Sequence, residues 1–160
     1  MRAIDVMASP VYVVAPGGDN VAYARNLMLK HRVSRLPVME GGDELRGGIL
    51  TKKDIAYRLR QTEPMWRRRP IDRIPVSILM APEPITIAPQ TGIREIAAIM
   101  LDKDISGIPV VEEGRVSGIV TKLDVMRSAH IRGLTAKVSD IMEDAVTVNR
   151  YHSLDTSSTR

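Results

Sequence analysis

The residues with the clearest chemistry in this 160-residue chain are a threonine and an aspartate that occur twice at the same spacing. Thr51 precedes Asp54 by three positions, and Thr121 precedes Asp124 in the same way. At a helix start, such a pair can form a capping box, which stabilises the helix by about 1 kcal/mol. A carboxylate there can also bind the two hydroxyls of a ribose, and the free amides of the helix N-terminus suit a phosphate. The two interpretations can hold together.

Basic residues near these patterns are the candidates for binding a phosphate. They are His31, Arg32, Arg35, Lys52 and Lys122. Each could instead be a solvated surface charge. These basic residues predict a site that favours a negatively charged ligand.

The two copies differ in charge at equivalent positions. Arg32 of the first copy corresponds to Asp104 of the second, and Arg35 corresponds to Gly107. An anionic ligand should therefore prefer a cleft lined by the first copy, which predicts one strong site and one weak or empty site. The sequence does not tell which aspartate shares that cleft.

These residues belong to a longer duplicated sequence. Glycine, two apolar residues, Thr-Lys-x-Asp and a further apolar residue occur at 48–55 and again at 118–125. Each is preceded by Ser-x-apolar-Pro-Val, at 34–38 and at 106–110. Such a duplication predicts two copies of one supersecondary unit that bury apolar faces against each other, with a cleft between them. Ser34 and Ser106, which open the second pattern, could bond a ligand or their own backbone.

Apolar periodicity predicts the same order of elements in both copies, β-α-β-β-α. In the first copy we expect strands at 11–14, 36–39 and 46–50, helices at 20–31 and 51–60, and a turn at 41–44. In the second copy we expect strands at 85–87, 108–111 and 116–120, a helix through 93–100 and another from residue 121. The predicted fold class is α+β, with two repeats packed sheet to sheet around a pseudo-twofold axis.

Composition limits the class of protein. The chain is 44% hydrophobic and 26% charged, as in ordinary soluble domains, and no apolar run approaches the roughly 20 residues that span a bilayer. It has no cysteine, which excludes disulfides and thiolate metal sites and fits a cytoplasmic location. With no Phe, one Trp and four Tyr, it offers few rings on which the bases of single-stranded nucleic acid could stack.

The excess of basic charge lies in one connector. Residues 58–73 hold six arginines against two acidic residues, which accounts for the whole formal charge of +4. A run at Arg67–Arg69 follows Trp66. The connector could be a solvated, proline-stiffened link, a lid over ligand phosphates or a docking site for an acidic partner. Nucleic-acid binding is disfavoured, because phosphate contacts alone give salt-sensitive, non-specific binding.

The copies divide the chain into segments. We expect a first repeat at 1–62, a connector at 63–75, a second repeat at 76–130, the start of an incomplete third repeat at 131–154 and a disordered tail at 155–160. The third repeat is inferred because 138–142 and 146–148 repeat the pattern of 76–80 and 85–87. The chain is then part of a longer four-copy protein, or the third start is a native extension.

The duplicated Gly-apolar-apolar-Thr-x-x-Asp pattern and the upstream apolar-Pro-Val strand resemble the cystathionine-β-synthase (CBS) domain family over about residues 1–130. The resemblance implies a tandem pair, or Bateman module, that binds AMP, ADP, ATP or S-adenosylmethionine between its paired sheets and requires no cofactor. It also implies that two such pairs often associate into a disc-shaped dimer. The expected protein is a homodimeric sensor that signals metabolite state to a partner.

The resemblance further assigns roles to residues of this chain. Asp54 and Asp124 would hold the ribose hydroxyls, while Thr51, Thr121 and the nearby basic residues would contact ribose or phosphate. The residues expected to flank the base are Pro37, Ile108 and Pro109. The methionines that open each copy (Met7, Met80 and Met142) could fill the core or line the adenine pocket.

Catalysis has little support in the sequence. The three histidines, at 31, 130 and 152, lie in different segments, and no nucleophile with a base or metal-ligand spacing is evident. We therefore expect a protein that is not an enzyme. The alternative to a sensor is a structural dimerisation module with empty clefts, which docks a partner through its basic connector.

Overall fold

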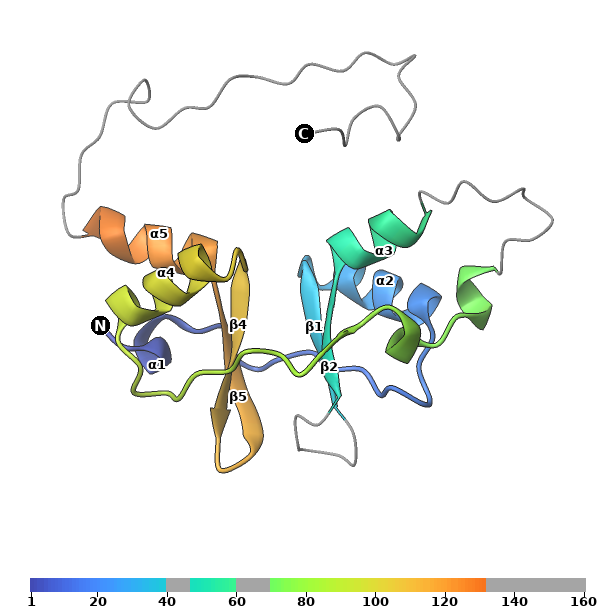
Figure 1. Cartoon of the computed structure of the whole chain (residues 1–160), viewed down its shortest axis with the longest axis horizontal. Coiled ribbons are helices and arrows are strands. Elements are labelled where there is room, and N and C mark those ends of the chain that lie inside the picture. Colours follow the sequence, from blue (N-terminus) through green and yellow to red (C-terminus); the bar gives the residue numbers. More distant parts are fainter. Residues whose placement is uncertain (40–46, 60–69, 132–160) are drawn as a thin grey trace, which may run out of the picture.

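The structure, a computed structural model, describes residues 1–39, 47–59 and 70–131. These residues form two similar units, each with an antiparallel hairpin and two helices. The first unit contains α2 (Val21–Lys30), β1 (Arg35–Val38), β2 (Gly48–Thr51) and α3 (Lys52–Leu59). The second contains α4 (Ile93–Asp102), β4 (Gly107–Glu112), β5 (Arg115–Thr121) and α5 (Lys122–Ile131). The hairpins lie at the centre of the molecule and the helices lie outside them (Figure 1).

The helices form where the apolar spacing predicts them. The buried residues of α2 are Val21, Ala24 and Met28, and those of α4 are Ile93, Ile96 and Met100. The N-cap of α2 is Asn20, whose side-chain oxygen accepts a hydrogen bond from the backbone of Tyr23 at 2.8 Å. One stripe of each helix is therefore available to cover a hairpin.

Both of these helices end in the same way. Arg32 follows α2 with a φ of 55°, and Asp104 follows α4 with a φ of 47°. The amide of Val33 then donates to the carbonyl of Met28 at 3.0 Å, as expected of a left-handed helix terminus. This conformation usually takes glycine, so an arginine there carries backbone strain of about 1 kcal/mol.

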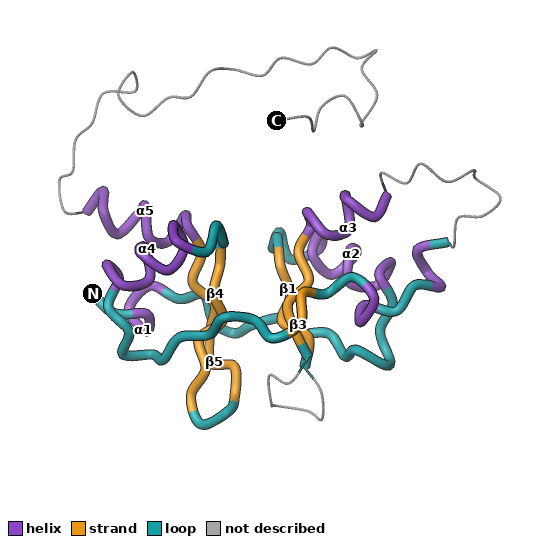
Figure 2. Tube along the Cα trace, in the orientation of Figure 1, coloured by secondary structure: helices purple, strands orange, loops and turns teal. Residues whose placement is uncertain are grey.

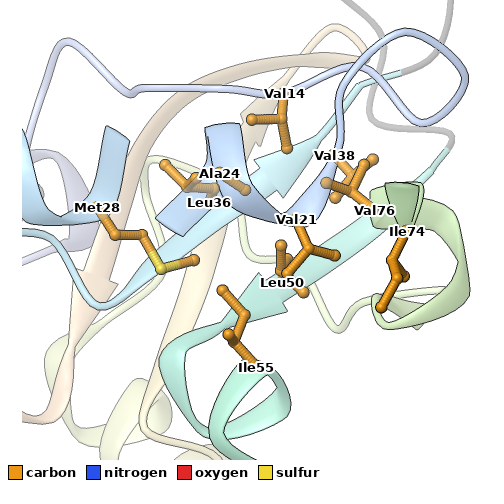
Figure 3. Packing of buried hydrophobic residues seen from close by; sticks show 10 residues of the cluster. All are labelled: Val14, Val21, Ala24, Met28, Leu36, Val38, Leu50, Ile55, Ile74 and Val76. Atoms are coloured by element: carbon orange, nitrogen blue, oxygen red, sulfur yellow. The ribbon is translucent and has the colours of Figure 1, made fainter. Parts of the chain in front are cut away.

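Each unit has its own apolar core. In the first, side chains of α2, β1, β2 and α3 pack with Ile74 and Val76 from the segment that follows residue 69 (Figure 3). In the second, side chains of α4, β4 and β5 pack with Ala3 from the short helix α1 (Ala3–Val6). Each core thus includes residues from the segment that leads into the opposite unit.

Hydrogen bonds fix these leading segments in place. Ala8 forms an antiparallel bridge with Ile119 of β5, and the amide of Ala3 donates to the carbonyl of Thr91 at 2.8 Å. The 3₁₀ turns Ile71–Arg73 and Val76–Ile78 precede β3 (Ala81–Pro82), which pairs with β2. The two segments cross between the units in opposite directions (Figure 2). Each unit is therefore completed by the segment that leads into the other unit.

The α+β class and the pairing of two similar units confirm the sequence prediction, with one correction. The strands expected at 11–14 and 85–87 are reduced to single bridging residues, Val14 beside Val38 and Ile87 beside Val110. Prolines at 10, 16, 84 and 89 flank these segments and lack the amide hydrogen that a longer ladder needs. The sheets therefore consist mainly of the two hairpins.

Several predicted features lie outside the described residues. These are the turn at 41–44, the Arg67–Arg69 run, most of the incomplete third repeat with Met142, and the tail at 155–160. In the part of the chain that is described, no helix has the length and apolar character needed to cross a membrane.

Candidate functional site

A cavity of about 680 Å³ lies between the two units. Its wall includes the leading segment 7–12, residues 32–35 that enter β1, and residues of β5 and the start of α5. The polar and charged residues that line it are Ser9, Tyr12, Arg32, Ser34, Arg35, Ser106, Thr121, Lys122 and Asp124. The two copies thus contribute different parts of one cleft.

Asp124 is held by the helix start to which it belongs. Its Oδ2 accepts hydrogen bonds from the backbone amide of Thr121 at 2.8 Å and from the Thr121 hydroxyl at 2.6 Å. The other oxygen, Oδ1, has no hydrogen-bond partner among the described residues. The side chain is half-buried in the wall of the cleft. Capping therefore uses one carboxylate oxygen and leaves the second available to a ligand.

Asp54 makes the same local structure in the other unit. Its Oδ2 accepts from the Thr51 amide at 2.7 Å and from the Thr51 hydroxyl at 2.6 Å. It does not line the central cleft, however. It borders a separate hollow of about 430 Å³ between α3 and the turn at 76–78. The structure therefore brings Asp124, and not Asp54, into one cleft with the basic residues of the first copy.

Arg35 reaches across the boundary between the two units. Its guanidinium donates hydrogen bonds to the Ser106 hydroxyl at 3.0 Å and to the Ser34 hydroxyl at 3.4 Å. Burial lowers the pKa of Arg35 below its usual value, and the nearby carboxylate of Asp124 opposes this only in part. Its Nε is buried and has no hydrogen-bond partner in the described part of the chain. Arg35 is therefore a partly desolvated cation with donor capacity left in the cleft.

Gly107 makes room for this arginine. A β-carbon added at Gly107 would overlap the Nη1 of Arg35 and lie only 2.8 Å from its Cδ. Gly107 is the counterpart of Arg35 in the second copy, so the two positions meet near the pseudo-twofold axis. A side chain at position 107 would displace the Arg35 guanidinium from its present place. The difference between the two copies at this position thus allows their close contact.

The charges around the cleft are unequal as well. Among the described residues, Arg32, Arg35 and Lys122 line it together with a single carboxylate, that of Asp124. Lys122 also lies 3.8 Å from Asp104, whose side chain is 95% exposed. An exposed pair at this distance interacts weakly, so Asp104 offsets little of the positive charge that Lys122 contributes to the cleft. The lining therefore favours a ligand with negative charge.

Tyr12 is a lining residue that the sequence reasoning did not single out. Its ring stacks on the ring of His31, with centroids 3.7 Å apart and planes at 23°. His31 is not in the wall of the cleft, but it supports the residue that is. The second copy has Ile85 and Lys103 at the equivalent places. The sequence has no Phe, one Trp and four Tyr, so each aromatic residue could have been considered as a candidate to contact a ligand.

Seven of the fourteen predicted site residues line the central cleft: Arg32, Ser34, Arg35, Ser106, Thr121, Lys122 and Asp124. Thr51, Lys52 and Asp54 belong to the other helix start and do not line it. The strand residues expected to flank the base are also absent from its wall. Pro37 and Pro109 are buried in the hairpins, and Ile108 is fully buried in the second core. Ile108 points into the core because β4 is covered by the helices of its own unit.

The leading segments explain the repeated glycines. A β-carbon at Gly118 would overlap the Met7 side chain, and one at Gly48 would overlap the Ala81 carbonyl oxygen and lie 3.2 Å from the Met80 side chain. Met7 packs on the second core, as one of its two predicted roles requires, and it also lines the cleft. The glycine that opens each Thr-x-x-Asp pattern is therefore needed for packing of the leading segments.

Sequence comparison matches a CBS domain to residues 3–61 and another to residues 71–131. "CBS domain-containing protein YhcV" of Bacillus subtilis is 31% identical over 121 residues, which cover 76% of this chain and 80% of that protein. An inosine-5'-monophosphate dehydrogenase of Korarchaeum cryptofilum is 33% identical over 131 residues, covering 81% of this chain. The chain spans only a quarter of the length of that enzyme.

Structural comparison agrees with the sequence match. The CBS domain pair of protein MJ0100, solved in complex with 5′-methylthioadenosine and S-adenosyl-L-methionine, superposes with a TM-score of 0.70 at 27% identity. The match covers 82% of this chain and 98% of the MJ0100 pair. Two domain matches over most of the chain, with the same arrangement in space, show that this protein belongs to the CBS domain family and contains a tandem CBS pair.

Proposed function

We propose that this chain is a non-catalytic regulatory module that binds an adenosine-containing ligand in the cleft between its two CBS domains. The observation that carries the proposal is Asp124, whose Oδ1 accepts no hydrogen bond from any residue that the structure describes and which lines a cleft of about 680 Å³ between both domains. A carboxylate held rigidly by its helix start can accept hydrogen bonds from two adjacent hydroxyls of a ribose. The volume is in the range of small-molecule sites.

The relative MJ0100 supports the ligand class, since its CBS pair binds two adenosine compounds. Tyr12 is suited to contact a planar base, because its ring is held by His31 at the edge of the cleft. Arg32, Arg35 and Lys122 are suited to substituents on the sugar. Binding would change the packing between the domains by no more than the ligand's difference in affinity for the two arrangements. A partner protein would detect that change.

We also propose that the module acts as a cytoplasmic homodimer. The support is a set of exposed apolar side chains on the outer helices. They are Leu29 on α2, Leu101 on α4 and Met126 on α5, each more than half exposed. A symmetric interface between two copies of the chain would remove these side chains from water. The alternative, an empty dimerisation module that docks a partner through Arg67–Arg69, remains a prediction, because those residues lie outside the described part.

The proposal is tested by comparing Asp124→Ala with Asp54→Ala. Both substitutions remove the same capping interaction, so both should lower stability by about 1 kcal/mol. Because a hydrogen bond to a charged group is worth about 1.5–3 kcal/mol, Asp124→Ala should weaken binding of an adenosine ligand tenfold or more. Asp54→Ala should leave that affinity unchanged.

The measurement is calorimetric titration with AMP, adenosine, 5′-methylthioadenosine and S-adenosylmethionine, together with thermal unfolding. A ligand at 100 times its dissociation constant should stabilise the wild-type protein by about 2.7 kcal/mol. If none of the four compounds stabilises it, the empty dimerisation module is the better explanation. If the two alanine variants lose affinity equally, the central cleft is not the site.

A further inference from the structure

We propose that the first unit carries a second ligand site, separate from the central cleft, which takes a small organic anion with an apolar group attached to its charge. The site is the hollow of about 430 Å³ between α3 and the turn at 76–78. The residues that line it are Lys53, Asp54, Tyr57, Arg58, Ile78 and Leu79. None of them lines the central cleft, so the inference does not depend on the proposed function.

The first argument is that Arg58 is a half-buried cation without a partner. It lies in the last turn of α3, and its Nε is buried and has no hydrogen-bond partner among the described residues. Its guanidinium also forms no ion pair with any residue in that part of the chain. Removing a guanidinium from water is costly unless an anion compensates. The fork of Arg donors matches the oxygens of a carboxylate, so an organic acid in the hollow would supply the missing partner.

The helix that carries Arg58 does not supply this partner itself. Asp54 lies four residues earlier on α3, at a spacing that can give an ion pair on a helix. Its Oδ2 instead accepts hydrogen bonds from the amide and the hydroxyl of Thr51, at 2.7 and 2.6 Å. Lys53 adds a second positive charge to the wall. The described wall thus holds two cations and one carboxylate that is already engaged at the helix start, which favours an anion.

The second argument is that apolar surface lies beside this charge. The side chains of Tyr57 and Ile78 are both more than half exposed, and Leu79 joins the same wall while packing against the first core. A ligand that offered only a charge would leave this surface in water, whereas an apolar group would cover it. Small-molecule sites have volumes in this range and combine apolar walls with a few polar groups. The hollow therefore fits a carboxylate carried by a ring or a short chain.

The third argument is that the second unit has different chemistry at the equivalent place. The counterpart of Arg58 is Ser128, which is buried and donates to the carbonyl of Val125 at 2.7 Å. The counterpart of the apolar Ile78 is the acidic Asp5. Ser128 is satisfied within its own helix, and Asp5 would repel an anion. The site should therefore belong to the first unit alone, with one organic anion per chain.

The experiment is an NMR titration of the full chain labelled with carbon-13 at its isoleucine methyl groups, in which the signal of Ile78 reports on the hollow. The probes are phenylacetate, acetate, which offers the charge alone, and phenylethylamine, which offers the ring with the opposite charge. We expect phenylacetate to shift the Ile78 signal with a dissociation constant of about 1 mM or below, and the other two probes to bind about tenfold more weakly. Arg58→Gln should weaken phenylacetate binding by about tenfold. Arg58→Lys should retain part of it, because it keeps the charge but loses the fork of donors.

Arg94→Gln is the matched control, because Arg94 is exposed on α4 and lines neither cavity. It should leave the titrations unchanged, and saturating AMP should not alter phenylacetate binding to wild type. No shift of the Ile78 signal, equal binding of phenylacetate and phenylethylamine, or an unchanged affinity in Arg58→Gln would each overturn the inference. Displacement of phenylacetate by AMP would also overturn it, because the probe would then occupy the central cleft. These outcomes leave the proposed function intact, since that function is tested by the adenosine compounds.

Discussion

Replacing Gly107 by alanine should reveal how much the contact of Arg35 with the second domain contributes to stability. The new β-carbon would overlap the Arg35 guanidinium, which is the mobile end of a long side chain. The backbone at Gly107 lies outside the left-handed region, so alanine adds no backbone strain there. We expect the arginine to move aside and lose its hydrogen bond to Ser106, while the fold is kept.

The magnitude follows from two terms. Loss of the Arg35–Ser106 bond should cost about 1.5 kcal/mol, the lower end for a hydrogen bond to a charged group, because Ser106 is exposed. The change from glycine to alanine restricts the unfolded chain and returns about 0.4–1 kcal/mol. Gly107→Ala should therefore destabilise the protein by about 0.5–1 kcal/mol. In an Arg35→Ala background only the second term remains, so the same substitution should stabilise.

The assay is urea unfolding of wild type, both single variants and the double variant, followed by circular dichroism. The double-mutant cycle should give a coupling free energy of about 1.5 kcal/mol between positions 35 and 107. Positions that do not interact give additive effects within about 0.5 kcal/mol. Additivity of Gly107→Ala and Arg35→Ala would refute the contact and with it the placement of Arg35 in the cleft.

Further predictions concern the backbone at other glycine and arginine positions. Arg32→Gly should raise the free energy of unfolding by up to about 1 kcal/mol in urea titration, because it relieves a φ of 55°, and it should at the same time weaken AMP binding. A loss of stability would contradict the strain argument. Gly48→Ala should cost about 1–3 kcal/mol in the same assay, because its β-carbon would meet the carbonyl oxygen of Ala81, which cannot move alone. Gly118→Ala should cost less, since it meets the flexible side chain of Met7, and equal losses at the two glycines would refute this explanation.

Local patterns in the sequence were sufficient to predict most of the helices and strands. The helix expected at 20–31 is observed at 21–30, and the strands expected at 108–111 and 116–120 are observed at 107–112 and 115–121. Apolar spacing and turn residues determine such elements over a few neighbours, so a single chain contains enough information. The repeated order also made the tandem arrangement predictable.

Contacts between distant segments were not predictable. The sequence did not indicate that residues 1–8 pack on the second domain, or that this brings Asp124 together with Arg32 and Arg35. Periodicity reports which face of an element is buried, but not which partner covers it. The role of Tyr12 was missed for the same reason, since its stacking on His31 depends on where the leading segment lies.

The exchange of leading segments has a consequence for how the protein is made. Ala3 and Ala8 are synthesised well before Thr91 and Ile119, the residues to which they are hydrogen-bonded in the folded pair. These contacts can therefore form only after residue 119 has been synthesised. Neither half could be excised at the midpoint without taking away a piece of the other's interior. The two domains should therefore be kept together whenever the pair is truncated or expressed.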